Sequence, residues 1–400
     1  MSNQATHRKT TTHRAWLLLA AASLLIAAPA QADVSTVLKG GPTFSNEDGS
    51  STFRLRGRIH FDSALYFEDG ESMHNGFLFR RTRLGVQGKV DNDWIYMVEY
   101  DFAENGVDAK DVYVGYTGLP VNVKAGQFKV PFSLEELTSS NSITFMERSL
   151  ANVFAPARRI NLGIDTSGDR YSVAASTFGR AIGASVEGDQ PMGAGLRATV
   201  NPLEPTSDRI IHLGAAATWE RTDNNNTWRW RQRPESRVDG ASQDHGGRLV
   251  DTGSLENSRA ITRVGGELAW IEGPLAIQGE YILTDLDRGD EDNLMFDGYY
   301  AQASFVLGGS HGYRNGVMRG VSIDKDSDFG AVEFAARYSH VNLNADPVLG
   351  GNMSAITLGT NWHVNPNIRF MLNYGIILTD DEGPRSDDPM VLQARAQVAF

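Results

Sequence analysis

The chain has 400 residues, no cysteine and a formal net charge of −12, which results from 49 acidic and 37 basic residues. Nucleic acid is not an expected partner, because phosphate backbones are bound by net basic surfaces. Without disulfides, an exported chain of this length needs a large core or a closed hydrogen-bonded sheet to hold it together.

The N-terminal residues have the pattern of a secretory signal peptide. Three bases precede an apolar run at residues 16–28, and the small-residue site Ala30-Gln31-Ala32 follows. The apolar run is shorter than the roughly 20 residues of a spanning helix, which argues against a transmembrane anchor. We predict that residues 1–32 are a signal peptide cleaved after Ala32. Cleavage removes the three bases and no acid, so the formal charge falls from −12 to −15.

From residue 52 onward, short segments alternate apolar and polar residues, which indicates β-strands with one apolar and one wet face. Sixteen segments are predicted, at residues 52–67, 77–90, 94–102, 109–116, 121–129, 159–166, 171–178, 196–202, 210–221, 260–271, 275–284, 296–307, 329–341, 356–364, 368–378 and 390–400. We expect an all-β fold, a transmembrane antiparallel β-barrel of 16 strands over residues 52–400 with inward-folded loops. A periplasmic N-terminal segment at residues 33–51 precedes it.

The predicted connections alternate in length along the chain. Tight turns such as Asp91-Asn92-Asp93 alternate with long segments at residues 130–158, 179–195, 222–259 and 342–353. Short turns at one rim and long loops at the other are typical of outer-membrane barrels. Two connections are exceptions, at residues 201–209 and, longer, at residues 308–328, because both fall on the short-turn rim. A constriction of the aqueous lumen requires a loop that folds inward, and the segment at 130–158 is the third external loop.

Several short motifs follow one another in a fixed order: Phe79-Arg80-Arg81-Thr82-Arg83-Leu84-Gly85-Val86, residues 96–101, Gly126-Gln127-Phe128-Lys129 with Pro131-Phe132, Leu134-Glu135-Glu136-Leu137-Thr138-Ser139-Ser140, Phe145-Met146-Glu147-Arg148, Ala157-Arg158-Arg159, Gly298-Tyr299-Tyr300-Ala301-Gln302 and the terminal Phe400. This ordered set resembles the phosphate-selective porin O/P family over nearly all of the mature chain. The resemblance implies a homotrimer of sixteen-stranded barrels, with loops folded into the lumen and arginines that lead an anion to a narrow binding zone. Phe400 resembles the terminal aromatic residue that the outer-membrane assembly machinery recognises.

The third external loop departs from the family pattern. Phosphate-selective members carry lysines after the Phe-x-Leu-Glu element, whereas here Glu135-Glu136 is followed by Ser140-Asn141-Ser142 without a lysine. This departure puts phosphate selectivity in question. Other bases could compensate, namely Lys129, Arg148, Arg158 and Arg159, or Arg314, Arg319 and Lys325 in the long connection of the short-turn rim.

Seven bases are candidate ligands on the anion pathway: Arg58, Arg81, Arg83, Lys129, Arg229, Arg231 and Arg233. The last three alternate along an extended segment, so their guanidinium groups, about 7 Å apart, would pass an oxyanion from fork to fork. Two other interpretations remain open. The arginine stripes of the first two strands could be a solvated wall paired with acids such as Glu99, Asp101 and Asp111. Trp228 and Trp230 could lie on the outer surface, which would make the arginines beside them interfacial anchors.

The sequence contains no convincing catalytic motif. Residues 308–312 match a nucleophile elbow, but no strand-to-helix context surrounds them, and no metal, Walker or dinucleotide spacing is present. We therefore predict no enzyme activity, cofactor or metal.

The predicted function is that of a porin in the cell outer membrane. It allows passive diffusion of small anions, with phosphate or polyphosphate among the candidates, through a water-filled pore with an arginine-lined constriction. The alternative is a general diffusion porin with little anion selectivity, and a barrel enzyme or an adhesin is a distant third. The expected partners are small anionic solutes, outer-membrane lipid and lipopolysaccharide, and further copies of the chain in a homotrimer.

Overall fold

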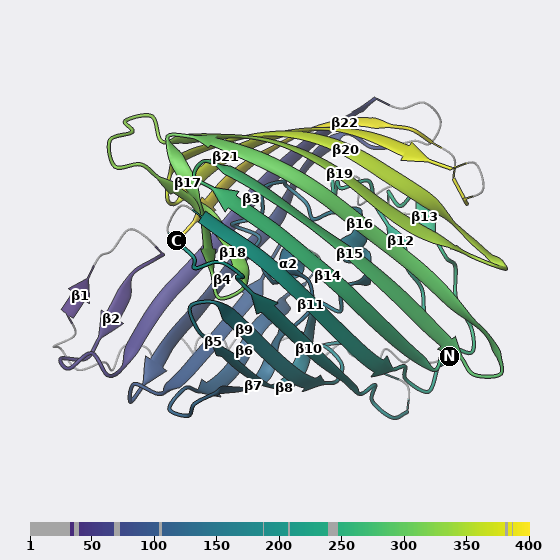
Figure 1. Ribbon diagram of the computed structural model, residues 1–400, viewed down its shortest axis with the longest axis horizontal. Coiled ribbons are helices and arrows are strands. Elements are labelled where there is room, and N and C mark those ends of the chain that lie inside the picture. Colours follow the sequence, from purple (N-terminus) through teal and green to yellow (C-terminus); the bar gives the residue numbers. More distant parts are fainter. Residues whose placement is uncertain are drawn as a thin grey trace, which may run out of the picture.

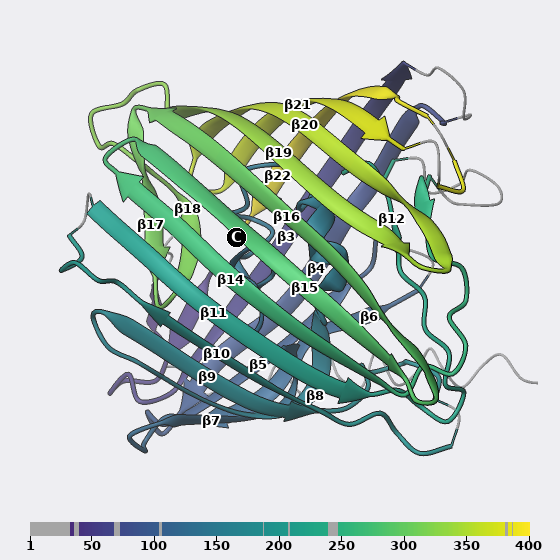
Figure 2. The ribbon, with the colours of Figure 1, turned by 45° about the vertical axis from the view of Figure 1, so that its right-hand side comes forward.

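The computed structural model describes residues 33–35, 40–67, 73–103, 106–186, 188–206, 209–238, 247–380, 383–385 and 387–400. The predicted signal peptide, residues 1–32, lies outside these described residues. Within them, sixteen antiparallel strands close into a barrel (Figures 1 and 2), which confirms the predicted fold class. The barrel closes where its last strand, β22, pairs with its first, β3, in a register that runs from Met390↔Phe67 to Ala399↔Arg58.

The sixteen barrel strands differ in length around the barrel. They are β3 (Thr52–Phe67), β4 (Gly76–Val90), β5 (Trp94–Asp101), β6 (Asp108–Tyr116), β7 (Asn122–Lys129), β8 (Arg158–Ser167), β9 (Tyr171–Phe178), β10 (Gly193–Val200), β11 (Arg209–Arg221), β14 (Ala260–Glu272), β15 (Leu275–Arg288), β16 (Glu291–Leu307), β19 (Ala331–Ala345), β20 (Val348–Asn365), β21 (Ile368–Thr379) and β22 (Met390–Ala399). Strands β5 to β10, which we call the low wall, have 8 to 10 residues each. The other ten strands, the tall wall, have 10 to 18.

One predicted connection was wrong. The segment at residues 342–353 was expected to be a long external loop, but β19 continues to Ala345 and β20 begins at Val348. The two strands are paired there, for example at Asn342↔Asn352. The outward positions Asn342, Asn344 and Asn352 are polar and alternate with the buried Leu343 and Met353, so the apolar pattern that marks a lipid-facing strand is lost although the strands continue.

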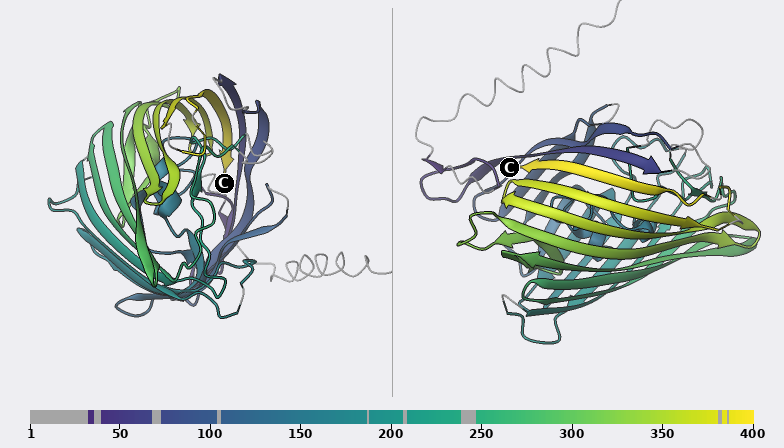
Figure 3. Two further views of the ribbon diagram at one scale, coloured as in Figure 1. Left: turned by 90° about the vertical axis from the view of Figure 1, so that its right-hand side faces the viewer. Right: turned by 90° about the horizontal axis from the view of Figure 1, so that it is seen from above.

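Two external loops fold into the lumen, which the sequence left open for each of them. Loop L3, residues 130–157, contains the short helix α2 (Leu134–Leu137) and the 3-10 helix η1 (Leu150–Phe154). Loop L5, residues 222–259, contains the paired strands β12 (Arg231–Gln232) and β13 (Val250–Asp251). In the left view of Figure 3, segments lie inside the ring of strands. The lumen is therefore narrowed by the chain itself.

The long connection of the short-turn rim also enters the lumen. It forms an antiparallel hairpin of β17 (Gly309–Arg314) and β18 (Val317–Ile323), which we call the inserted hairpin. The hydroxyl of Tyr313 lies 2.8 Å from Nδ1 of His212 on β11, and Arg197 of β10 donates to the carbonyl of Gly316 at 2.7 Å. The hairpin thus runs along the lumenal side of β15, β14 and β11 and reaches β10 of the low wall with its tip. This explains why the connection is long on a rim that otherwise carries tight turns.

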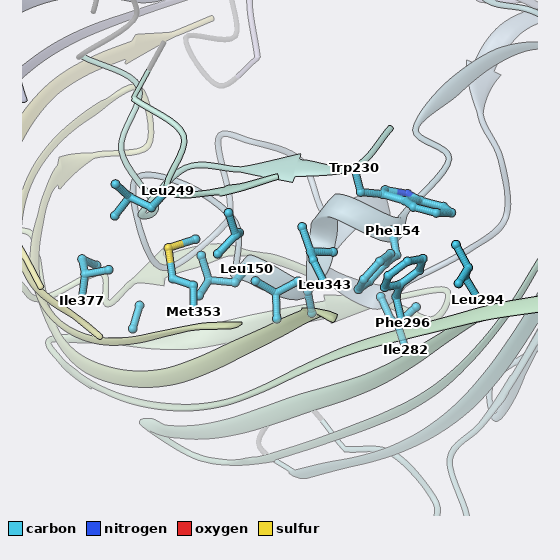
Figure 4. Close-up of a cluster of buried hydrophobic side chains, with 14 of the residues drawn as sticks. Leu150, Phe154, Trp230, Leu249, Ile282, Leu294, Phe296, Leu343, Met353 and Ile377 are labelled. Atoms are coloured by element: carbon cyan, nitrogen blue, oxygen red, sulfur yellow. The ribbon is translucent and has the colours of Figure 1, made fainter. Parts of the chain in front are cut away.

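L3 and L5 pack on an apolar core inside the barrel. The ring centroid of Trp230 of L5 lies 6.0 Å from that of Phe154 of η1 and 5.3 Å from that of Phe296 of β16 (Figure 4). Tall-wall residues such as Ile282 and Met353 complete this cluster. Strands of the tall wall therefore bury apolar side chains on their lumenal face as well as presenting them to lipid.

The two ends of the described chain meet the same rim of the barrel. Strand β2 (Thr43–Ser45) pairs with the start of β3, and β1 (Asp33–Ser35) pairs with β2, so that both extend the sheet beyond the barrel (Figure 1). The backbone of Phe400 exchanges two hydrogen bonds with Gly57, of 2.8 and 3.0 Å. Its ring covers Gly57, where an added Cβ would lie 2.5 Å from Cζ. No helix among the described residues is long and apolar enough to cross a membrane.

Candidate functional site

A basic cavity of about 430 Å³ opens in the lumen between the first two strands, L3 and the inserted hairpin. Nine bases line it: Arg56, Arg58, Arg81, Arg83, Lys124, Lys129, Arg148, Arg158 and Arg319. The one acid among its lining residues is Asp111. Because such a concentration of cations in a narrow space attracts anions, the cavity is the candidate functional site.

A β-bulge in β4 adds an arginine to this region. His60 pairs with Arg81, but the next residue, Phe61, pairs with Phe79, so Arg80 is the extra residue. The two consecutive arginines both point inward, where Arg80 forms two hydrogen bonds with Glu147 of L3, of 2.8 and 3.0 Å. The bulge therefore places more positive charge at the lumen than strict alternation allows.

Acids behind the cavity hold the arginine side chains in place. Glu99 of β5 lies within 3.3 Å of three guanidinium groups, those of Arg56, Arg58 and Arg83. Arg83 also binds Asp101 at 2.7 Å. The interpretation of the arginine stripes as walls paired across strands is thus correct for these residues. It does not exclude a role for them, because three guanidinium groups paired with two carboxylates leave a local excess of positive charge.

L3 presents polar groups to the same cavity. The hydroxyl of Ser140 accepts a hydrogen bond of 2.8 Å from Arg58, and Ser139 also lines the cavity. Lys129 donates to the carbonyl of Glu136, while Arg148 binds the carbonyls of Glu135, Glu136 and Thr138. The cavity therefore offers hydroxyl donors beside guanidinium and ammonium donors, a set that suits an oxyanion.

A second cavity, of about 260 Å³, continues the first toward the low wall. Lys124, Lys129 and Arg319 line both cavities, and Arg197 of β10 is added in the second. The shared residues show that the two spaces adjoin. Together they form a passage between the low wall and the inserted hairpin that is lined mainly by bases; Asp165 also lines the second cavity and is paired with Lys124 at 2.7 Å.

The L5 arginines lie apart from these cavities. Arg229 is exposed and forms two hydrogen bonds with Asp251 of β13, the one from Nε being 2.7 Å long. The pKa of Arg233 is lowered to about 10, first by burial and then by four neighbouring cations, Arg237, Arg248, Arg80 and Arg231. The crowding of Arg233 and Arg80 shows that the bases of L5 approach those of β4. The alternative in which Trp230 lies on the outer surface is wrong, because only 3% of its surface is exposed and it packs inside the barrel (Figure 4).

The structure thus divides the seven predicted residues into two groups. Arg58, Arg81, Arg83 and Lys129 gather in the basic cavity, whereas Arg229, Arg231 and Arg233 stand on L5. Of the bases considered as substitutes for the missing L3 lysines, Arg148, Arg158 and Arg319 line the cavity, while Arg159, Arg314 and Lys325 do not.

Sequence reasoning missed Arg80 and Lys124. The bulge at Arg80 breaks the two-residue period of β4, and no feature of the local sequence indicates that a bulge occurs there. The ammonium group of Lys124 lies 5.4 Å from the ring centroid of Phe128, which shares the lumenal side of β7. Because an aromatic residue usually indicates the lipid-facing side of a barrel strand, Phe128 gave no sign that this face of β7 is lumenal.

Comparisons with known proteins agree with this architecture. A family model described as phosphate-selective porin O and P matches residues 53–400. Porin O of Pseudomonas aeruginosa is 27% identical over 392 residues, which cover 87% of this chain and 88% of that protein. The anion-selective porin from Comamonas acidovorans has a similar fold, with a TM-score of 0.57, 12% identity and coverage of 88% of this chain and 100% of that one. The trimer form of OmpT of Vibrio cholerae also has a TM-score of 0.57, with 11% identity and the same coverages.

Proposed function

Because the chain belongs to the phosphate-selective porin O and P family, we propose that this outer-membrane porin selects small anions in its basic cavity. Solutes diffuse passively through the lumen, and selection results from the width of the passage and from the field of its bases. The observation that carries the proposal is the composition of the cavity lining, in which nine bases face one acid.

The donor set favours oxyanions such as phosphate or polyphosphate over simple halides. Guanidinium groups present paired N–H donors that match two oxygens of one oxyanion, and the hydroxyls of Ser139 and Ser140 add single donors. Anions would meet Arg231 and Arg233 of L5 first and then the cavity. Lys124, Lys129 and Arg319 would conduct them past the inserted hairpin into the second cavity.

The runner-up function is general diffusion with little anion preference. It is favoured by the ion pairs that neutralise part of the cavity, such as Arg158–Asp111 at 2.6 Å and Lys129–Glu136 at 3.3 Å. The formal net charge of the mature chain, −12 less the three bases of the predicted signal peptide or −15, also reduces the long-range attraction of anions.

The two functions are separated by electrical recordings from the purified protein in planar bilayers. Reversal potentials in a potassium chloride gradient should show a preference for chloride, and the single-channel conductance should saturate as phosphate is added. A preference for potassium would refute anion selectivity. A chloride preference without saturation by phosphate would support a pore that is anion-selective but has no phosphate site.

The proposed assembly is a homotrimer. Strands β5, β7, β9 and β10 of the low wall have 8 residues each, fewer than the roughly 9–11 that a tilted strand needs to cross the bilayer. Contact with neighbouring copies would cover a wall that is too short for lipid. Mass measurement of the protein in a mild detergent tests this, and a monomer that conducts alone would contradict it.

A further inference from the structure

We propose that Arg337 is a positioning residue that latches both inward loops to the tall wall, so that the constriction and the L5 arginines are held as one unit. Arg337 lies on the lumenal side of β19 and has only 3% of its surface exposed. Its Nη1 donates to Glu135 of L3 at 3.1 Å, and its Nη2 donates to Glu235 of L5. One guanidinium group thus binds a carboxylate from each loop.

The L3 side of the latch organises the loop itself. Besides Arg337, Glu135 accepts hydrogen bonds from the backbone amide and the hydroxyl of Ser149, at 3.0 and 2.7 Å. Arg337 also donates to the carbonyl of Glu147 at 3.0 Å and stacks over the ring of Phe145, 4.4 Å from its centroid. These contacts tie the start of α2 to the segment before η1, which is the part of L3 that faces the basic cavity.

The L5 side of the latch ends in a socket in the barrel wall. Glu235 is 6% exposed and accepts hydrogen bonds from the hydroxyls of Ser339 and, at 2.8 Å, Thr357. Its backbone adopts a φ of 51°, a conformation that is unfavourable for a side chain larger than glycine. The wall contacts hold this conformation. Because Glu235 follows Arg233 by two residues, the socket determines where the L5 arginines stand.

A role for Arg337 as an anion ligand fits the structure poorly. Its guanidinium is buried among two carboxylates, a carbonyl and an aromatic ring, and it lines neither the basic cavity nor the second cavity. Removal of the guanidinium leaves two buried carboxylates without their common partner, which is far more unfavourable than the loss of an exposed ion pair. A variant without the guanidinium relieves this penalty when L3 and L5 loosen, because both carboxylates then reach water.

Cysteine reporters can test the latch, because the chain has no cysteine of its own. Ala151→Cys reports on L3 and Val250→Cys on L5, since each position is 1% exposed in the inner core. The measurement is the rate at which a membrane-impermeant thiol reagent modifies each reporter in the folded barrel. Arg337→Met should accelerate both reactions by at least about tenfold, as expected when a buried charged hydrogen bond is lost.

The single-loop variants should separate the two sides of the latch. Glu135→Gln should accelerate only the L3 reporter, and Glu235→Gln only the L5 reporter. Arg369→Met is the matched control, because Arg369 is 4% exposed on β21 and donates to the L3 carbonyl of Ile143 at 2.9 Å. It should leave the L5 reporter unchanged. Arg337→Lys keeps the charge but lacks the fork, so it should release at least one loop even if Arg337→Met fails to fold.

The latch is overturned if Arg337→Met and Arg337→Lys leave both reporters as slow as in the parent, or if Glu235→Gln releases L3 as strongly as L5. The importance of the latch for selectivity rests on the proposed function, so reversal potentials are recorded on the same variants. If the reporter rates change in the variants as expected but the parent shows no anion preference, the latch is upheld and the proposed selectivity is refuted. If the parent is anion-selective but the reporter rates do not change in the variants, the proposed selectivity is upheld and the latch is refuted.

Discussion

Arg319 offers a direct test of the basic cavity, because it can be removed without disturbing the barrel. It is an exposed residue of the inserted hairpin that lines both cavities, and it forms no ion pair with any residue that the structure describes. We predict that Arg319→Gln weakens the binding of anions in the passage and leaves the fold intact.

The size of the effect follows from the dimensions of the cavity. A sphere of 430 Å³ has a radius of about 5 Å, at which two unit charges interact by about 0.8 kcal/mol in bulk water and about 3 kcal/mol at an effective dielectric constant of about 20. The lower figure corresponds to about a fourfold change in an equilibrium constant. Arg319→Gln should therefore raise the half-saturating concentration of a monovalent anion at least about fourfold, and more for divalent phosphate.

The assay is the dependence of single-channel conductance on phosphate concentration. Arg314→Gln is the matched control, because Arg314 belongs to the same hairpin and lines neither cavity. It should leave the half-saturating concentration unchanged. If both variants match the parent, or if Arg314→Gln has the larger effect, the assignment of the anion pathway to the basic cavity is wrong. High salt should reduce the difference between Arg319→Gln and the parent, because mobile ions screen the charge.

Three further predictions concern other parts of the pathway and the closure of the barrel. Glu99→Gln should increase the chloride preference in reversal-potential measurements, because Arg56, Arg58 and Arg83 lose the carboxylate that they share; an unchanged or lower preference would contradict a cavity controlled by net charge. Replacement of Arg231 and Arg233 by Gln should lower the anion preference more than Arg229→Gln does, because Arg229 is already paired with Asp251; equal effects of the two changes would count against a ladder role. Gly57→Val should destabilise the closed barrel by about 1–3 kcal/mol, because its side chain would occupy the position of the Phe400 ring; the midpoint of denaturant unfolding measures this, and an unchanged midpoint would show that the ring is not needed there.

The barrel could be predicted from the sequence because alternation is a local property with a period of two residues. The segment predicted at residues 52–67 is β3 (Thr52–Phe67), and Arg58, His60 and Asp62 are buried on its lumenal side. The bulge at Arg80 was missed, because its cause lies in the pairing with the neighbouring strand and not in the residues themselves.

The position of the loops could be expected only from the family resemblance. L3 is fixed by contacts between residues that are distant in sequence, such as the hydrogen bond from the amide of Leu134 to Glu280, which joins residues 146 positions apart. Trp230 shows the same limit. Its local pattern allowed both an outer-surface and an inner position, and only its packing against Phe154 and Phe296 decides between them.

One feature of the sequence does indicate the inner apolar core. Strands that face water in the lumen should alternate, yet β15 carries Ile282 beside Leu283, and β16 carries Met295 beside Phe296. Met295 is 53% exposed on the outside, whereas Phe296 is 1% exposed within the cluster. A barrel strand with apolar side chains on both faces is expected to be covered by protein on the inside, because exposure of those side chains to a water-filled lumen is unfavourable.

The same asymmetry supports the side of the lumen on which we propose that solutes pass. The lumenal face of β15, β16, β19 and β20 is covered by L3 and L5, while the bases of β3, β4, β7 and β8 remain around the two cavities. The proposed passage is therefore eccentric and runs along the basic side, where Arg58, Lys129 and Arg319 line one cavity. On the proposed pathway an anion stays within a few ångströms of fixed positive charge, because the acids that line the two cavities, Asp111 and Asp165, are each paired with a base, Arg158 and Lys124.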